Sequence, residues 1–556
     1  MSFELPSNTP FLLAQTGLHT IDYAIVGVYM MIMLGIGGYL ARQQTTSEEF
    51  FVGSRHLPWW AVGISMIATL MSTLSYLGAP GEIIQHGLSI TLALIGLPIT
   101  YYIVGYIWVP FFMQLRLTSA YEYLDMRFGG AAKWVAVVSY LYMRFVWMGA
   151  IIFTASMALA QMTQSTAPEA LASLSGGLIQ IDEKAWLYIV IIATGVISTL
   201  YTALGGIKAV IWTDVMQFTF LFLGAVLTVI IIAGETGSGP VDWITEITSS
   251  SHAFPAIASW DLSERTTVLW VVLSGIIWNI CTHCSDQVAL QRYFTTESAS
   301  AARKVAAMNY FLDTTMQLLL GLVGAALLYY FIRHVNLLPP GVTDPRDPYF
   351  ADKIFPHFIV HGLPIGVSGL IIAAIFAVAQ SSLDSGINSS TTVIVVNIIR
   401  RKDSGMTDHT ELRVAQGLTL LIGFLITIIG VLFTMYPENK NIIDLQMKSF
   451  NCVLGPLGAL FMMGILLPHV GRQTALISVV LGIVSGLAMG YTDVIAEHYG
   501  VKVSSISPFM LGPVSWAFTM ITAAFLGGLL PGPHPEQVRG LTYQSVRRGE
   551  KHEALR

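Results

Sequence analysis

The sequence predicts an all-α, polytopic membrane protein with about thirteen transmembrane helices, forming a single membrane domain over residues 1–556. Hydrophobic residues make up 54% of the chain and charged residues only 11%, whereas charged residues reach about 25% in soluble domains. The mean hydropathy is +0.66. The apolar residues also gather in runs of about 20, the length that a helix needs to cross a bilayer. These runs must be helices because lipid leaves no partner for an unpaired backbone group.

Composition also excludes several classes of protein. The net charge is only −5, and no dense basic face suits a nucleic acid. The three cysteines, Cys281, Cys284 and Cys452, are too few for a disulfide framework. No Lys or Arg precedes Arg42, so the first apolar run lacks the charged head of a cleavable signal peptide and is expected to remain as a span.

Thirteen apolar segments follow one another along the chain. The segment at 357–398 is too long for one span, and we expect it to continue into a cytoplasmic end. The segments are 20–40, 58–78, 88–113, 134–163, 187–204, 209–233, 267–290, 308–332, 357–398, 414–435, 447–467, 473–492 and 506–530.

The distribution of basic residues predicts the orientation. Nineteen of the 28 Lys and Arg residues, Arg292 among them, fall in loops on one side, eight fall on the other, and Arg144 lies in mid-helix. Basic loops face the cytoplasm, so we expect the N-terminus outside and the C-terminus inside. We expect the tail 531–556 to be cytoplasmic and loose, and the outer loop 234–266 to be too short to fold alone.

Two polar clusters lie five segments apart. One is the hydroxyl-rich stretch 66–81, which ends in Gly78 and Pro80, and the other is 278–287. Helices interrupted at matching positions of two halves indicate a transporter site at their interface. Because five is odd, the second half would be inverted relative to the first. The alternative for the first cluster is helix packing through small residues.

A third cluster, 379–392, combines hydroxyls with a carboxylate. Ser381, Ser385 and Asn388 share one helical face, and Asp384 lies among them. Such hard oxygen donors suit an alkali cation. Hydroxyls that bond to their own helix carbonyls are the alternative explanation.

Two further polar features are less specific. The pair Gly205 and Gly206 predicts a tight cytoplasmic turn, after which Asp214 serves either as a helix N-terminal carboxylate or as a cation contact. Arg144 either extends its side chain to the cytoplasmic surface or binds an anion.

Together these stretches resemble the sodium:solute symporter family, within the sodium/glucose cotransporter-like superfamily, over about residues 21–530. The matching stretches are 51–55, 57–63, 118–124, 127–128, 201–217, 286–287, 291–293 and 381–390. The resemblance implies an inverted five-helix-repeat (LeuT-like) core. The repeats would be 58–233 and 267–467, with an extra N-terminal helix at 20–40 and two extra C-terminal helices over 473–530.

The resemblance also implies ion sites. The family's shared sodium site maps onto the carbonyls of Ala68, Met71 and Val378 and the hydroxyls of Ser381 and Ser382. A second sodium, which some members bind, would map onto Asp214, Asp384 and Ser385.

For the solute site the resemblance favours the monocarboxylate, multivitamin and iodide branch. Segments 70–72 and 77–80 fit that branch, whereas several sugar contacts of the family do not match. Its solutes are anions, which would suit Arg144. The candidate substrate-binding residues are Ser72, Thr73, Ser75, Arg144, Asn279, Thr282 and Asn451.

The resulting hypothesis is sodium-coupled secondary active symport of a small organic solute into the cell by alternating access, with an organic anion such as a carboxylate as the solute. The alternatives are a sugar or other neutral solute, or a proton carried by Asp384 in place of sodium. We expect an integral protein of the cell (inner) membrane that binds sodium, a small solute and lipid, and no nucleic acid. No obligate protein partner is evident. We expect no enzyme, because His283 with Ser285 is the only hint of a nucleophile and base.

Overall fold

The computed structural model describes residues 17–551 except for short gaps at 43, 45, 165, 175–180, 251–253, 255–258, 261–266, 340, 348–349, 401–406, 436–441 and 501–506. Within these residues the regular structure is entirely helical. Some of the basic residues used for the orientation lie outside the described part, namely Arg265, Arg401, Lys402, Lys440, Lys502 and Arg556.

Eleven helices of the described chain are long and apolar enough to cross a membrane, and they accommodate the thirteen predicted segments. α10 (Glu183–Thr236) contains both 187–204 and 209–233, because Gly206, at φ 54° and ψ −158°, interrupts the helix at the predicted turn. The stretch Ser75–Gln114 contains the end of segment 58–78 and all of 88–113. The shorter Trp59–Leu70 contains the start of 58–78.

The two predicted interruptions are present in the backbone. α3 (Trp59–Leu70) and α4 (Thr73–His86) are separated by the extended residues Met71 and Ser72. α12 (Val268–Ser285) and α13 (Gln287–Phe294) are separated by the extended Asp286. In both cases a side chain caps the new helix: Ser72 Oγ accepts from the Ser75 amide at 3.3 Å, and Asp286 Oδ1 from the Val288 amide at 2.9 Å.

The first interruption falls inside the hydroxyl-rich stretch 66–81, before Gly78 and Pro80, which both lie inside α4. A proline inside a helix removes one backbone hydrogen bond, and α4 nevertheless includes Pro80.

The other long helices, together with α10, surround these broken helices. They are α1 (Thr20–Ala41), α8 (Gly130–Thr163), α14 (Ala299–Arg333), α16 (Val367–Ile394), α17 (Asp408–Phe433), α18 (Ile442–Leu466), α19 (Arg472–Gly490) and α21 (Pro508–Gly527). The short α5 (Leu97–Ile103) and α6 (Val109–Gln114) are parts of the single stretch Ser75–Gln114. Short helices lie at the ends of the spans: α2 (Ser47–Val52), α7 (Tyr121–Phe128), α9 (Ala167–Leu174), α11 (Pro240–Ser249), α15 (Ile354–His361), α20 (Thr492–His498) and α22 (Tyr543–Arg547). The residues of η2 (Gly87–Gly96) and η3 (Val104–Trp108) connect α4, α5 and α6.

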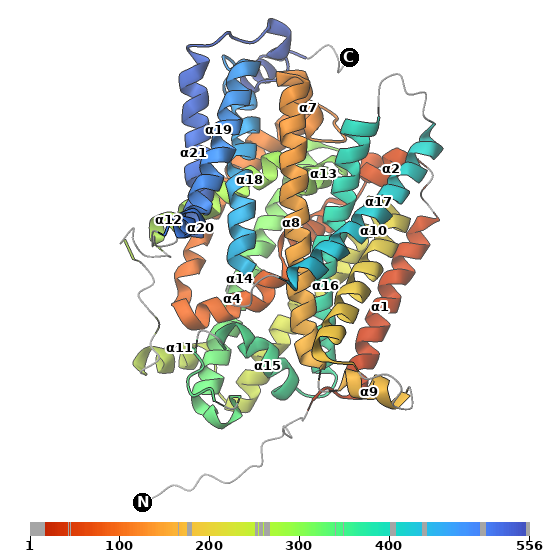
Figure 1. The fold of residues 1–556 in the computed structure, drawn as a ribbon, viewed down its shortest axis with the longest axis vertical. Coiled ribbons are helices and arrows are strands. Elements are labelled where there is room, and N and C mark those ends of the chain that lie inside the picture. Colours follow the sequence, from red (N-terminus) through yellow and green to blue (C-terminus); the bar gives the residue numbers. More distant parts are fainter. Residues whose placement is uncertain are drawn as a thin grey trace, which may run out of the picture.

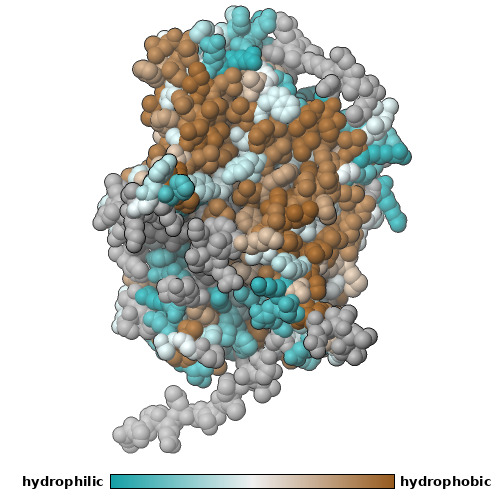
Figure 2. All heavy atoms as spheres, in the orientation of Figure 1, coloured by the Kyte–Doolittle hydropathy of each residue, from teal (hydrophilic) through white to brown (hydrophobic). Residues whose placement is uncertain are grey.

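Burial separates central from peripheral helices. The apolar windows of α16 and α18 are 89% and 94% buried, whereas that of α1 is 17% buried and lies at the edge of the bundle (Figure 1). Apolar side chains cover the middle of the face in Figure 2, with hydrophilic ones toward both ends, as expected for a protein surrounded by lipid. The first described helix, α1, starts at one end of the bundle, and the last, α22, lies at the other end (Figure 1), which agrees with an odd number of crossings.

The long segment 357–398 is divided at Gly366 (φ 87°), where the chain turns between α15 and α16. The helix that follows runs on through the π-helical turn Val395–Ile399, which makes it 33 residues long. One expectation about segment ends is wrong. The tail is docked rather than loose as far as it is described: Leu541 is buried, and its carbonyl accepts a hydrogen bond from Tyr123 Oη at 3.0 Å.

Candidate functional site

Two serine hydroxyls of α16 meet the interrupted end of α3. Ser381 Oγ donates to the Ala68 carbonyl at 2.8 Å and lies 3.0 Å from the Val378 carbonyl. Ser382 Oγ lies 3.1 Å from the Thr69 carbonyl and 3.3 Å from the Met71 carbonyl. All these residues are buried.

The interruption explains why these carbonyls are available. The Met71 amide makes the last backbone bond of α3, to Ile67 at 2.9 Å, and the extended backbone at Met71 and Ser72 carries the following amides away. The carbonyls of Ala68, Thr69 and Met71 therefore need partners from outside the helix. Neutral carbonyl and hydroxyl oxygens gathered in this way form a set that suits a hard monovalent cation.

All five groups predicted for the first ion, on Ala68, Met71, Val378, Ser381 and Ser382, thus come together. The carbonyl of Thr69 joins them, and sequence reasoning missed it. The only sequence signal for the Thr69 carbonyl was its position between Ala68 and Met71, whose carbonyls were predicted as ligands.

A second cluster lies beside the first and is built around Arg292 of α13. The guanidinium donates to Asp214 Oδ2 at 2.9 Å, to Ser385 Oγ at 2.6 Å and to Ser65 Oγ at 2.9 Å, and it also contacts Thr69 Oγ1. Asp214 Oδ2 in turn accepts from Ser65 Oγ at 2.5 Å. Arg292 and Asp214 are both fully buried.

The position of Arg292 corrects the sequence analysis. We counted it as a cytoplasmic loop charge, but its side chain is 1% exposed and binds groups from three other helices. Its acceptors come from distant parts of the chain, so no local pattern indicated its burial.

Asp384 lies at the edge of this cluster. It accepts hydrogen bonds from Tyr201 Oη at 2.9 Å, from the Ser385 amide at 2.6 Å and from Ser385 Oγ at 3.4 Å. Of the three residues predicted for a second sodium, Asp214 and Ser385 accept from Arg292, and Ser385 links Asp384 to them.

The predicted solute residues lie on four helices. On α4, Ser72 is the N-cap, Thr73 Oγ1 is buried without a hydrogen-bond partner among the described residues, and Ser75 is exposed. On α12, Asn279 Nδ2 donates to the Gly275 carbonyl at 3.0 Å, and Thr282 Oγ1 has no partner in the described part of the chain.

The remaining two solute candidates have partners of their own. Asn451 of α18 donates to the Pro508 carbonyl at 3.5 Å, toward α21. Arg144 of α8 does not extend to the membrane surface, because it is buried and forms an ion pair with Asp286 at the α12–α13 interruption. Its Nε atom remains without a partner.

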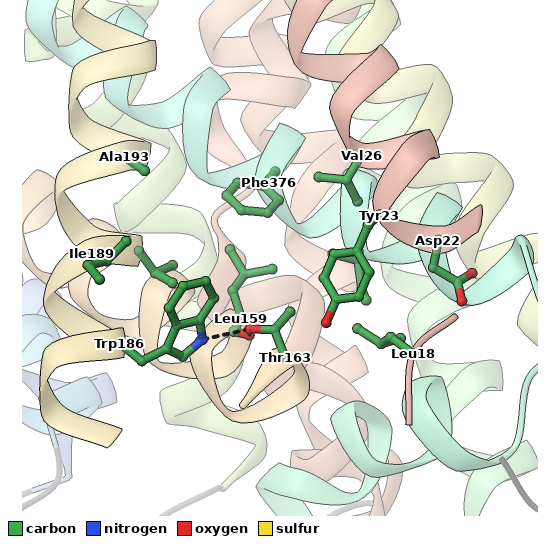
Figure 3. A pocket seen from close by; sticks show the side chains of 12 residues that line it. Leu18, Asp22, Tyr23, Val26, Leu159, Thr163, Trp186, Ile189, Ala193 and Phe376 are labelled. Carbon is green, nitrogen blue, oxygen red and sulfur yellow. Dashed lines mark hydrogen bonds between the residues drawn. The ribbon is translucent and has the colours of Figure 1, made fainter. Parts of the chain in front are cut away.

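A separate cavity of about 200 Å³ lies between α1, α8, α10 and α16 (Figure 3). Its lining is almost entirely apolar, and Trp186 Nε1 at its edge donates to Thr163 Oγ1 at 2.9 Å. None of the predicted site residues lines it.

The structure shows other partners for His283 and Ser285, which the sequence suggested as a possible base and nucleophile. His283 Nδ1 bonds Tyr293 Oη at 2.7 Å, and Ser285 Oγ donates to the Cys281 carbonyl at 2.8 Å, so histidine and serine are each engaged elsewhere. Among the described residues no three His, Cys, Asp or Glu side chains form a metal-binding group.

Comparisons with known proteins agree with this geometry. Residues 50–482 match the model of the Sodium:solute symporter family. The sodium/sialic acid symporter SiaT of Proteus mirabilis is 28% identical over 502 residues, which cover 89% of this chain and 94% of that one. Human sodium-coupled monocarboxylate transporter 2 is 26% identical, over 83% of this chain and 71% of its own.

Solved structures support the fold. A substrate-bound, outward-open Na⁺-coupled sialic acid symporter superposes with a TM-score of 0.77 at 26% identity, covering 92% of this chain and 99% of its own. Mhp1, a nucleobase-cation-symport-1 transporter, superposes with a TM-score of 0.51 at 12% identity over 88% of this chain and 97% of its own, which indicates a shared fold alone. The predicted all-α fold with an inverted five-helix-repeat core is confirmed.

Proposed function

Because the chain belongs to the sodium:solute symporter family and is therefore a sodium-coupled symporter and no enzyme, we propose that its solute is a small organic anion, carried into the cell. The relatives named above are symporters of sialic acid or transporters of monocarboxylates, and both kinds of solute are acids. Family membership makes sodium the coupling ion, with the membrane lipid around the protein.

The observation that carries this proposal is the meeting of Ser381 and Ser382 with the carbonyls at the end of α3. We assign the transported sodium to the oxygens of Ala68, Met71, Val378, Ser381 and Ser382. A sodium ion there would replace hydroxyl donation to the same carbonyls, so it would join α16 to the interrupted segment. Since the ion contacts both elements, its binding would favour the arrangement in which they are together.

We assign the solute to the space next to this interruption. The amino terminus of α4 begins at Thr73, and the free amides at the start of such a half-helix attract an anion. The unpaired, buried hydroxyl of Thr73 and the exposed Ser75 are suited to contact a carboxylate there. Asn279, Thr282 and Asn451 would face the rest of the solute.

Arg144 is our candidate for a positive charge in the site. Its ion pair with Asp286 neutralises it, and its Nε atom has no partner. A solute carboxylate could therefore compete with Asp286 for the guanidinium, and this competition would couple solute binding to the α12–α13 interruption.

Sodium entry supplies enough free energy for uptake. Each inward charge gains about 2.3 kcal/mol per 100 mV, whereas a tenfold solute gradient needs about 1.4 kcal/mol. Coupling between the two ligands is reciprocal, so solute should tighten sodium binding as sodium tightens solute binding.

We also propose that the N-terminus lies outside the cell and the C-terminus inside. The support is the excess of basic residues in the loops on one side of the spans. Cysteine-accessibility labelling of single cysteines introduced at Gly239 and at Glu550 would test this orientation in cells.

The experiment that tests the function is uptake into proteoliposomes containing the purified full-length chain. Radiolabelled sialic acid, a monocarboxylate and glucose are each supplied at fixed pH, with an inward sodium gradient, with equal sodium on both sides, or with an inward proton gradient alone. We expect sodium-driven accumulation of one of the acids. Accumulation of glucose but neither acid would contradict the proposed anion, and uptake driven by protons without sodium would contradict the proposed ion.

A further inference from the structure

The cavity between α1, α8, α10 and α16 (Figure 3) leads from the lipid-facing surface into the helix bundle. Ile189 and Ala193 line it on the α10 side, and both are exposed although α10 spans the membrane. Leu159 of α8 and Ile372 of α16 also line it, but they are only 1% and 2% exposed. The cavity therefore connects side chains that lipid covers with side chains that lie inside the bundle.

The cavity lies where α1 and α10 are apart. Toward the end of α1 the two helices are in close contact, since a Cβ added at Gly37 would lie 2.6 Å from Tyr201 Cβ. About three to four turns earlier on α1, Tyr23 and Val26 lie on one side of the cavity and Trp186 of α10 lies on the other (Figure 3). The two helices thus touch near one membrane surface and are separated by the cavity near the other.

The polar groups in the lining are already engaged within the protein. Trp186 Nε1 donates to Thr163 Oγ1 at 2.9 Å, and Tyr23 Oη forms a hydrogen bond with Thr166 Oγ1. The Asp22 carboxylate accepts from three backbone amides at 2.8–2.9 Å. A buried water needs two to four polar partners, and a polar ligand needs partners as well. The described lining therefore favours an apolar occupant.

Membrane hydrocarbon is the apolar material in contact with this opening. An empty apolar cavity destabilises a protein in proportion to its volume, which is about 200 Å³ here. In other proteins apolar cavities of similar size stay dry and bind small apolar molecules. An acyl chain of the surrounding bilayer would enter this one without crossing water.

The opening also lies at a suitable depth for a lipid whose headgroup stays at the membrane surface. Trp186 comes three residues after the start of α10, directly beyond the exposed, charged stretch 182–184. Tyr23 comes three residues after the start of α1 at Thr20. Tryptophan and tyrosine are enriched at the boundary between headgroups and hydrocarbon, so the cavity begins where the acyl chain of a lipid begins.

We propose that this cavity binds one acyl chain of a membrane phospholipid, which fills the space between the N-terminal helix α1 and the core helices. The chain contacts Ile372 and Phe376 of α16, the helix that carries the proposed sodium ligands Ser381 and Ser382. The site itself does not depend on the proposed sodium ion or solute. In the orientation proposed above, the lipid belongs to the outer leaflet.

The test is photolabelling of the purified full-length protein in bilayers that contain phosphatidylcholine with a diazirine near the middle of one acyl chain. Labelled residues are then located by mass spectrometry. We expect labels on Leu159 and Ile372, which lipid around the protein cannot reach, as well as on the exposed Ile189. Ala193→Phe, which places a ring at the opening, should lose the labels on Leu159 and Ile372. Val196→Phe is the matched control, because Val196 is 47% exposed on the same helix and does not line the cavity, and it should keep both labels.

Three results would overturn the proposal. Labels confined to exposed residues of the wild type, or no labels at all, would show that lipid stays outside the bundle. Labels on Leu159 and Ile372 that persist in Ala193→Phe would show that the chain does not enter through this opening. A free fatty acid or a quinone found bound one to one by native mass spectrometry, and blocking these labels, would contradict the choice of a phospholipid. Should Ala193→Phe fail to fold, Ile189→Trp narrows the same opening from an exposed position and takes its place.

Discussion

Ser381 Oγ donates to the Ala68 carbonyl at 2.8 Å and thereby joins the central helix α16 to the last turn of α3, where the first broken span ends. Removing this oxygen removes one proposed sodium ligand and one helix contact. A hydrogen bond contributes about 1 kcal/mol net, so we expect Ser381→Ala and Ser382→Ala each to raise the sodium concentration for half-maximal uptake about fivefold.

The measurement for this first prediction is the sodium dependence of uptake in proteoliposomes at saturating solute. Ser478→Ala is a suitable control, because Ser478 of α19 is a buried hydroxyl without a hydrogen-bond partner. Unchanged sodium dependence in both Ser381→Ala and Ser382→Ala would rule out their oxygens as sodium ligands.

Asp384 should control sodium affinity through its charge rather than its shape. Asp384→Asn keeps the volume and removes the carboxylate, so we expect the sodium requirement to rise by tenfold or more, about 1.4 kcal/mol. Tyr201→Phe removes only the hydroxyl that donates to Asp384 at 2.9 Å and should change the sodium requirement by less than the Asn variant does.

Sodium titration of substrate-free protein by isothermal calorimetry would compare these two variants directly. A larger effect of Tyr201→Phe than of Asp384→Asn would mean that the hydrogen bond, and not the charge, matters for sodium.

Residue types alone predicted the polar stretches 66–81 and 379–392, because hydroxyls and carboxylates are unusual inside a membrane. The particular carbonyls of Ala68, Met71 and Val378 came from the resemblance to the symporter family, since these residue types carry no signal of their own. The exact residues of the first interruption did not follow from the sequence, because the Ser72 cap of α4 is a local hydrogen bond that many hydroxyls of the stretch could have made.

Long-range contacts explain the other differences. The burial of Arg292 depends on Ser65, Asp214 and Ser385, which come together only in the folded bundle. The docking of the tail depends in the same way on Tyr123 reaching the Leu541 carbonyl. Basic residues near the end of a span therefore cannot be assigned to a loop or to the core from charge patterns alone.

Close packing between α1 and α16 gives a prediction about stability. A Cβ at Gly369 would lie 2.5 Å from Asp22 Cα and 2.7 Å from the Asp22 carbonyl oxygen, and both are backbone atoms. Asp22 Oδ1 also accepts from the Gly366 and Gly369 amides at 2.8 Å. Gly369→Ala should therefore separate α1 from α16 and destabilise the protein by ~1–3 kcal/mol, the usual range for overpacking.

Thermal unfolding of the detergent-solubilised protein would measure this effect. Gly35→Ala in α1 is the matched control, because a Cβ at Gly35 meets nothing within 4 Å and alanine favours a helix by up to ~1 kcal/mol. We expect a lower melting temperature for Gly369→Ala and an unchanged or higher one for Gly35→Ala. Equal melting temperatures of wild type and Gly369→Ala would show that the two helices can move apart without cost.

The ion pair between Arg144 and Asp286 allows a separation of structural and solute-binding roles. Arg144→Gln leaves a buried carboxylate unpaired, which typically costs ~3–5 kcal/mol, whereas the double variant Arg144→Gln with Asp286→Asn removes both charges. We expect the double variant to recover most of the thermal stability lost in Arg144→Gln. If Arg144 also binds the solute carboxylate, the recovered protein should bind sodium normally but require at least tenfold more solute for half-maximal uptake, about 1.4 kcal/mol. Normal solute affinity in this stable double variant would assign Arg144 a purely structural role and leave the amino terminus of α4 as the anion site.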